Sequence, residues 1–268
     1  MPDNPRAASL DAILGVTRAR VAALGNRAAE LERAASAARP PRPFPIPGAR
    51  VGVIAEVKRR SPSQGAIREH LDPVAHAAAY ERGGAVAVSV LTDEAHFGGS
   101  IEDLRRVAAS VGLPVLRKDF VIDELQISEA RAAGASAVLL IARVLTPAQL
   151  DGLAGAVRQR GMVPLIEVHA PGELDAALAA GPGVVGVNAR DLDTFVIDLR
   201  AAEETVRRIP PEVPVVAESG IETREDVERL ARAGADFVLV GTSVAREPDP
   251  EQAVRELVGV KRHAGVRT

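Results

Sequence analysis

Glu56 and Lys58 are oppositely charged residues in a stretch that otherwise reads as a buried strand. The apolar run 51–57 contains Glu56, Lys58 follows it, and the turn-forming residues 61–65 (Ser-Pro-Ser-Gln-Gly) end it. A strand has a side-chain period of two, so both charges lie on one face. Burying two charges is costly unless they are paired or a site uses them. We therefore expect acid–base chemistry at this strand end.

Three other apolar runs carry a charged residue at or near their ends. They are Lys118 in the third run, Glu167 in the fifth and Glu218 in the seventh. One such residue would mark only where a strand meets water. In a closed barrel of parallel strands, however, alternate strands share interior layers and the active site lies at their carboxyl ends. With the first pair, these residues place three carboxylates and two ammonium groups in one layer, which predicts an acid–base site.

Eight short apolar runs alternate with eight segments of helical period, and this alternation is what positions those residues. The runs cover residues 51–57, 86–90, 114–118, 137–141, 163–168, 184–188, 215–218 and 237–241. The helical segments cover residues 73–82, 100–110, 124–133, 147–160, 171–180, 199–209, 224–233 and 250–264. The pattern predicts an α/β fold, a single (β/α)8 TIM barrel. An open doubly wound sheet is the alternative, but its Gly-rich nucleotide loop is absent from the sequence.

A helical extension is expected before the barrel. Residues 9–38 have apolar side chains at helical spacing, and Gly15 and Gly25 interrupt them, which predicts one helix or two. The proline-rich residues 40–47 cannot continue a helix. We expect residues 1–48 to form an N-terminal helical extension that packs on the barrel and residues 49–268 to form the catalytic (β/α)8 barrel.

The last two strand-to-helix turns have the small residues of an anion site. Ser219 and Gly220 follow the seventh run, and Gly241 and Thr242 follow the eighth. Backbone N–H groups in such turns can approach a phosphate closely, and a short helix after Gly241 would point its positive end at it. Ordinary turns can have this composition, but phosphate sites of such barrels lie after strands seven and eight. We therefore expect a phosphate here.

Further residues at the expected mouth could bind anions. Ser61 and Ser63 in the first loop offer hydroxyl donors. Arg190, just beyond the sixth run, has the planar fork that grips a carboxylate. The alternative for Arg190 is an ion pair with Asp191 or Asp193.

Two of the five phenylalanines, Phe97 and Phe120, stand in loops beyond strand ends, where a flat apolar ring could stack on them. Core filling is the alternative. If Phe97 serves the site, its loop, residues 91–99, would form a lid or an aromatic wall. The five histidines, at positions 70, 76, 96, 169 and 263, have no metal-binding spacing, so we predict no metal site. We expect them to be mostly solvated, with His169 alone near the mouth.

Composition excludes several classes of function. The 268 residues suit one barrel, and the net charge of −3 gives no basic field for nucleic acid. The chain has no cysteine, which excludes disulfides and a thiol nucleophile and fits the cytoplasm. The sequence has neither a signal peptide nor an apolar run long enough to span a membrane. We expect a cytoplasmic enzyme that acts on a small phosphorylated molecule.

Several motifs, in order and spacing, closely resemble those of the indole-3-glycerol phosphate synthase family. They are Ile54–Gly65 (IAEVKRRSPSQG), Leu91–Glu94 with Phe97–Ser100, Leu116–Phe120 (LRKDF), Leu165–His169 (LIEVH), Val187–Leu192 (VNARDL) and Ala217–Ile221 (AESGI). The resemblance covers residues 50–260, and the N-terminal helix fits the family's extension. No single motif would be specific, but the combination is.

The resemblance implies an enzyme of tryptophan biosynthesis that closes the ring of 1-(2-carboxyphenylamino)-1-deoxyribulose 5-phosphate with loss of carbon dioxide and water. Lys118 matches the family's general acid, and we expect Lys58 to lower its pKa. Glu56 and Glu167 match the base candidates, with their order of action left open. The resemblance implies no cofactor.

The resemblance also assigns the binding residues. Lys58 and Arg190 would hold the substrate carboxylate, and Asn188 and Glu218 would orient hydroxyl groups. The phosphate would be held by Ser61, Ser219, Gly220, Gly241 and Thr242. We expect a monomer, with a weak homodimer as the alternative. Competing functions are another phosphate-binding barrel, such as a phosphosugar isomerase or the tryptophan synthase alpha subunit, and a non-catalytic barrel that binds a phosphorylated metabolite and a partner protein.

Overall fold

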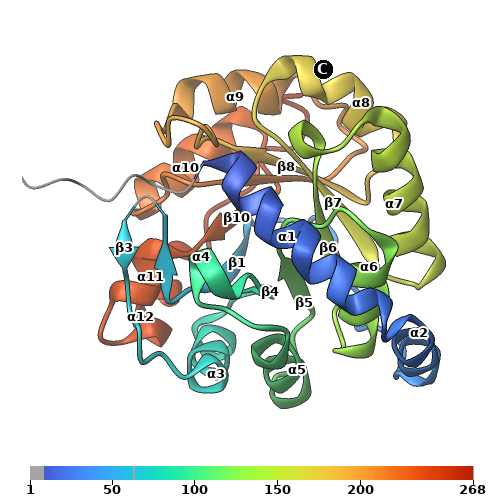
Figure 1. Cartoon of the computed structure of the whole chain (residues 1–268). Coiled ribbons are helices and arrows are strands. Elements are labelled where there is room, and N and C mark those ends of the chain that lie inside the picture. Colours follow the sequence, from blue (N-terminus) through green and yellow to red (C-terminus); the bar gives the residue numbers. More distant parts are fainter. Residues whose placement is uncertain (1–8, 63, 268) are drawn as a thin grey trace, which may run out of the picture.

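Eight parallel strands close into a barrel, which confirms the predicted (β/α)8 fold (Figure 1). The computed structural model describes residues 9–62 and 64–267. Around the barrel the strand order is β1-β10-β9-β8-β7-β6-β5-β4, so the first strand pairs with both the second and the last. The strands are β1 (Gly52–Val57), β4 (Ala87–Leu91), β5 (Val115–Lys118), β6 (Ala137–Ile141), β7 (Val163–Val168), β8 (Val184–Asn188), β9 (Val215–Glu218) and β10 (Phe237–Val240).

Helices follow the strands and surround the barrel (Figure 1). They are α3 (Pro73–Gly83), α5 (Ile101–Ser110), α6 (Glu124–Ala132), α7 (Pro147–Gln159), α8 (Leu174–Ala179), α9 (Leu199–Arg207), α10 (Arg224–Ala233) and α12 (Pro250–Leu257). Side-chain N-caps begin most of them, because a Ser, Thr or Asp oxygen accepts a hydrogen bond from an otherwise unpaired N–H of the first turn. The predicted helix 250–264 ends early, at Leu257, because the chain then returns to the barrel, where Val51 N donates to Val260 O.

Short elements occupy the loops at the carboxyl ends of the strands. A hairpin of β2 (Arg60–Ser61) and β3 (Gly65–Ala66) lies in the first loop, and α4 (Glu94–Phe97) in the second. The short helix expected after Gly241 is α11 (Thr242–Arg246). The 3-10 helices η1 (Ala142–Val144) and η2 (Pro171–Glu173) follow β6 and β7.

The N-terminal segment forms two helices, α1 (Leu10–Gly25) and α2 (Ala28–Ala37), with the break at Gly25 rather than Gly15. Helix α1 crosses in front of the strands (blue in Figure 1), and α2 packs on α6. Ile13 and Leu14 of α1 belong to the same buried apolar cluster as the barrel interior. No helix among the described residues is both long and apolar enough to cross a membrane.

Candidate active site

The odd-numbered strands of the barrel each give the interior an apolar residue and, two positions later, a charged one. The apolar residues are Ile54, Leu116, Leu165 and Val216, and all are fully buried. The charged residues are Glu56, Lys118, Glu167 and Glu218. The side-chain period of two therefore stacks the charged layer, which the sequence predicts, directly on an apolar floor, which was not predicted.

Lys118 lies at the centre of the charged layer. Its Nζ is 3.1 Å from Glu167 Oε2 and 3.6 Å from Glu218 Oε2. Lys58 Nζ is 3.4 Å from Glu56 Oε1. Glu56 near the end of β1 and Lys58 just beyond it therefore lie on the same face, as expected. Three carboxyl groups and two ammonium groups thus meet at one end of the barrel.

The electrostatic environment of Lys118 differs from the one expected. Burial lowers the pKa of Lys118, but Glu167, Glu218 and Glu56 outweigh burial and raise this pKa above its ordinary value. The expectation that Lys58 lowers the pKa of Lys118 is therefore wrong, because the ammonium of Lys58 pairs with Glu56 and carboxyl groups surround Lys118. The resting site holds Lys118 fully protonated.

Glu167 and Glu218 are neighbours that titrate in opposite directions. Burial and the charge of Glu167 raise the pKa of Glu218 well above its usual range. Burial also acts to raise the pKa of Glu167, but Lys118 and His169 outweigh it and the pKa falls. Glu218 therefore holds its proton more tightly than an ordinary carboxyl group, and its Oε2 lies 3.6 Å from Lys118 Nζ. One buried site thus holds two carboxyl groups whose pKa values are pushed apart, a pattern typical of acid–base sites.

Two glycines make room for these carboxyl groups. A Cβ on Gly186 of β8 would lie 2.4 Å from Glu218 Oε1, and one on Gly241 would lie 2.6 Å from Glu56 Oε1. The two even-numbered strands that flank β9 and β1 therefore need the smallest residue at these positions. This explains the glycine at each of these two positions.

The charged layer forms the base of a cavity of about 1150 Å³, counting the space open to solvent. The described residues that the sequence placed in the site all line it: Glu56, Lys58, Ser61, Phe97, Lys118, Phe120, Glu167, Asn188, Arg190, Glu218, Ser219, Gly220, Gly241 and Thr242. The expectation for Ser63 lies outside the described residues. Among those residues, no group of His, Asp or Glu side chains could hold a metal ion.

The two turns expected to bind phosphate lie together on one side of the cavity. Ser219 and Gly220 have positive φ angles of 69° and 72°, and Ser219 is one of two non-glycine residues with positive φ in the described chain. Such strained backbone concentrates at functional sites. Ser243 Oγ donates to Ile221 O at 3.0 Å and ties the turn after β10 to the turn after β9.

Arg190 points into the cavity rather than to its neighbouring aspartates. Arg143 forms ion pairs with both Asp191 and Asp193, so the alternative prediction, that Arg190 is their ion-pair partner, is wrong. The Nη1 of Arg190 donates to Phe195 O at 3.2 Å, which anchors the guanidinium at the cavity wall.

Phe97 and Phe120 form an aromatic wall. Their ring centroids are 6.4 Å apart at an interplanar angle of 38°, and both side chains line the cavity. Phe120 also belongs to the buried interior cluster, and Phe97 packs against it. Both interpretations of the phenylalanines, core filling and a wall for the site, therefore hold.

The expectation that the histidines are mostly solvated is wrong. His70 and His263 are exposed, but His76 is buried and His96 half-buried. The side chain of His169 is only 3% exposed because Glu167 and Glu173 enclose it. Burial of these rings depends on helix and loop packing, which spacing alone does not reveal.

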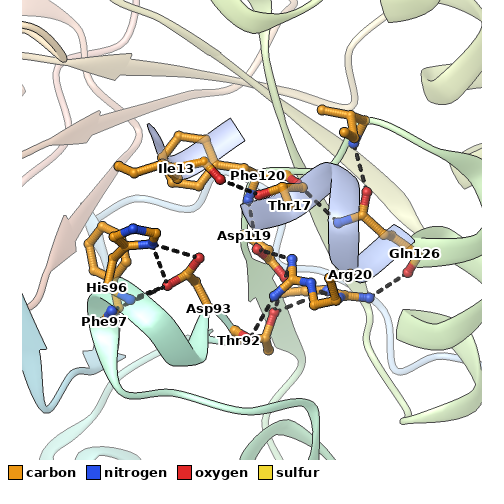
Figure 2. Close-up of polar contacts among 12 residues, drawn as sticks. Ile13, Thr17, Arg20, Thr92, Asp93, His96, Phe97, Asp119, Phe120 and Gln126 are labelled. Carbon is orange, nitrogen blue, oxygen red and sulfur yellow. Dashed lines mark hydrogen bonds and ion pairs between the residues drawn. The ribbon is translucent and has the colours of Figure 1, made fainter. Parts of the chain in front are cut away.

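A buried polar network that the sequence did not predict joins α1 to the site (Figure 2). The guanidinium of Arg20 donates to both oxygens of Asp119, at 2.7 and 2.8 Å, and to Thr92 O at 3.2 Å. Asp119 also accepts from Thr92 Oγ1, Arg117 Nη2 and the backbone N of Phe120. Since Asp119 separates Lys118 from Phe120 in the chain, the network fixes α1 and the end of β5 together.

We expect Arg20→Ala to lower the free energy of unfolding by about 1–3 kcal/mol, because the buried Asp119 loses the charged Nη2 that donates to both its oxygens. The remaining donors to Asp119 limit the loss. Urea unfolding followed by circular dichroism measures it. Arg27→Ala is the matched control, because Arg27 pairs with Glu30 at the exposed end of the same segment, where solvent screens the pair. Equal destabilisation by the two variants would contradict the role of Arg20.

Comparison with known proteins gives a consistent result along the chain. The family described as indole-3-glycerol phosphate synthase matches residues 10–257. The indole-3-glycerol phosphate synthase of Kineococcus radiotolerans is 50% identical over 217 residues, which cover 81% of this chain and 79% of that protein. Indole-3-glycerol phosphate synthase 1 of Streptomyces coelicolor is 44% identical over 262 residues, 96% and 97% of the two chains.

Solved structures of other enzymes share the fold alone. A thiamine phosphate pyrophosphorylase from Pyrococcus furiosus superimposes with a TM-score of 0.58 at 18% identity, covering 77% of this chain and 93% of that one. An N-acetylmannosamine-6-phosphate 2-epimerase from Clostridium perfringens has the same TM-score at 17% identity, with coverages of 76% and 90%. Identity and coverage among the sequence relatives are decisive: the chain belongs to the indole-3-glycerol phosphate synthase family.

Proposed function

We propose that the cavity closes the indole ring of 1-(2-carboxyphenylamino)-1-deoxyribulose 5-phosphate and releases indole-3-glycerol phosphate, carbon dioxide and water. Family membership makes the chain a carboxy-lyase of tryptophan biosynthesis. The observation that carries the residue assignment is the contact of Lys118 with Glu167 and Glu218 above the apolar floor. One general acid and one ionised carboxylate are the groups that this reaction needs at its centre.

The first half of the reaction forms the new carbon–carbon bond. The ring carbon that bears the carboxylate attacks the ketone carbon, and Lys118 donates its proton to the ketone oxygen, which becomes a hydroxyl group. The ring is then cationic and no longer aromatic, so it expels carbon dioxide and takes back the bonding electron pair. Because the substrate's own ring is the electron sink, the chemistry requires neither pyridoxal phosphate nor thiamine diphosphate.

The second half eliminates water. A base removes a proton from the ring system while an acid protonates the departing hydroxyl group, and the double bond of the indole forms. Glu167 is ionised and buried beside Lys118, which suits a base. Glu56, 4% exposed and held by Ser89 Oγ at 3.3 Å, is the second candidate for proton transfer. Glu218 and Asn188 would orient the hydroxyl groups.

Substrate binding divides the cavity into three parts. Lys58 and Arg190 hold the carboxylate of the anthranilate ring, and the aromatic wall of Phe97 and Phe120 takes the ring itself. The phosphate lies at the turns after β9 and β10. The residues that hold it are Ser61, Ser219, Gly220, Gly241 and Thr242.

We expect Arg190→Ala to raise KM about 10-fold or more while kcat changes little, because a charged hydrogen bond to the bound carboxylate is lost. Steady-state kinetics at several substrate concentrations measure the effect. Arg143→Ala is the control: it releases Asp191 and Asp193 in the same loop without lining the cavity. An unchanged KM for Arg190→Ala would contradict the carboxylate contact.

The experiment that tests the function is direct. The purified chain, without added metal or cofactor, should convert the anilino-deoxyribulose phosphate to a product with indole fluorescence. Absence of turnover by folded protein would contradict the proposal and favour a non-catalytic barrel.

The oligomeric state and location follow as part of the proposal. We propose a monomer in the cytoplasm, where the absence of cysteine is typical. Light scattering at assay concentration tests the monomer; a stable dimer would contradict it.

A further inference from the structure

His169 is a buried titratable residue that the proposed mechanism does not use. It follows β7 two positions after Glu167, beyond the buried end of the strand. The chain then turns through η2 and brings Glu173 back over the imidazole, where Glu173 Oε2 accepts from His169 N at 2.7 Å. The ring is thus enclosed between two carboxylates, with 3% of the side chain exposed.

Each ring nitrogen faces one of these carboxylates. His169 Nε2 lies 3.2 Å from Glu167 Oε1, and Nδ1 lies 3.8 Å from Glu173 Oε2. Both nitrogens are buried, and neither is aligned with a hydrogen-bond acceptor among the described residues. The contacts are therefore electrostatic, and a buried imidazole without aligned partners requires an explanation.

The two oxygens of Glu167 have different cations. Lys118 contacts Oε2 at 3.1 Å, and His169 contacts Oε1 at 3.2 Å. Lys118 is the group that gives its proton to the substrate, so its charge disappears in the middle of each turnover. No step of the proposed mechanism transfers a proton to or from His169, so its charge persists. Glu167 consequently keeps one positive neighbour after Lys118 becomes neutral.

We propose that His169 is a positioning residue, which keeps the Glu167 carboxylate ionised and oriented during the interval in which Lys118 is without its proton. The inference rests on the proposed function, because it takes Lys118 as the acid and Glu167 as the base. Without His169, the carboxylate would face a neutral amine on one side and no cation on the other. It would then retain a proton more readily and act as a weaker acceptor in the second half of the reaction.

The charges around this pair support the assignment. Burial lowers the pKa of His169, but Glu167 and Glu173 outweigh it and raise the pKa to about 9, so the ring is cationic at neutral pH. Burial likewise acts to raise the pKa of Glu173, but His169 and then Arg143 lower it. The Glu173 carboxylate thus keeps His169 charged from the outer side.

Among residues 9–62 and 64–267, the other side chains that face Glu167 from the neighbouring strands are acidic or uncharged. Glu218 and Glu56 face the site from β9 and β1 and are acidic. The residues paired with Glu167 on the adjacent strands, Ile141 and Gly186, carry no charge. Helices α7 and α8 cover the outer face of β7, and their acidic residues, Asp151 and Asp175, are exposed. Within the described part of the chain, the cations in ion-pair contact with Glu167 are therefore Lys118 on Oε2 and His169 on Oε1.

The test is His169→Gln, which keeps a polar side chain of similar length and removes the charge. We expect kcat at pH 7 to fall about 10-fold with KM within about twofold, and the acid limb of the kcat profile to move up by about one pH unit, because an opposite charge at this distance shifts a carboxyl pKa by one unit or more. Glu173→Gln should produce a smaller shift in the same direction. His70→Gln, at an exposed histidine, should leave both values unchanged.

A merely structural role would lower the melting temperature and leave the acid limb in place, and that result would overturn the proposal. NMR titration of the wild-type His169 ring tests the charge without any assay. We expect an imidazolium at pH 7 and a lower ring pKa in Glu167→Gln; a neutral ring at pH 7 would overturn the proposal even if His169→Gln fails to fold. An inactive wild-type enzyme would instead contradict the proposed function, and the titration would still report the ring's charge.

Discussion

Lys118→Met is expected to lower kcat by about 100-fold or more, on the scale of a lost general acid. Methionine preserves the length of the side chain but cannot protonate the ketone oxygen. The change also removes the ammonium beside Glu167 and Glu218, so the pKa of Glu167 rises and its carboxylate becomes easier to protonate. Single-turnover kinetics with saturating enzyme separate the loss of chemistry from any change in binding.

Lys261→Met is the matched control for this variant. Lys261 is exposed and is the one lysine of the chain outside the cavity, since the others are Lys58 and Lys118. It should keep wild-type kcat. Near-normal turnover by Lys118→Met would show that another group protonates the ketone, and Lys58 would then be the next candidate.

Glu167→Gln is the second variant with a large expected effect, a fall in kcat of about 100- to 10,000-fold. Glutamine fills the same space and cannot accept the proton. The change also leaves the ammonium of Lys118 and the imidazolium of His169 close together without the carboxylate that lay between them. Removing one partner of a buried pair costs roughly 3–5 kcal/mol, so the variant should also unfold at lower urea concentration.

Comparison of Glu167→Gln with Glu56→Gln shows which of the two carboxylates is the base in the second half of the reaction. If Glu167 is the base of the second half, rapid-quench analysis of Glu167→Gln should find a decarboxylated, hydroxylated intermediate that Glu56→Gln does not accumulate. The reverse pattern would give that step to Glu56. Circular dichroism at the assay temperature confirms that each variant is folded before its rate is interpreted.

The barrel could be predicted from the sequence because its two periods are local. Apolar runs at period two and helical segments at period 3.6 place most strand ends within a residue of their observed positions, as at Ala137–Ile141 and Val163–Val168. Lys118, Glu167 and Glu218 converge because strand parity alone decides which side of the barrel wall a residue faces. Their position required no knowledge of long-range contacts.

What could not be predicted depends on distances between parts of the chain far apart in sequence. Arg20 and Asp119 are separated by 99 residues, and nothing in either local pattern pairs them. The direction of the Lys118 pKa shift depends on the carboxyl groups around Lys118 and on Lys58 pairing with Glu56, which side-chain conformations decide. From the sequence, His169 is expected in a solvated loop. It is buried because η2 brings Glu173 back over its ring.

The seam between β1 and β10 has a consequence for synthesis on the ribosome. β1 carries Glu56, and its second neighbour in the sheet is the last strand to be made. About 185 residues separate Gly52 from Phe237, so at about 5–20 residues per second β1 waits roughly 10–40 s with one unpaired edge. A nascent chain released before Phe237 therefore has no closed barrel and no active site, and its exposed edge is a target for chaperones and proteases.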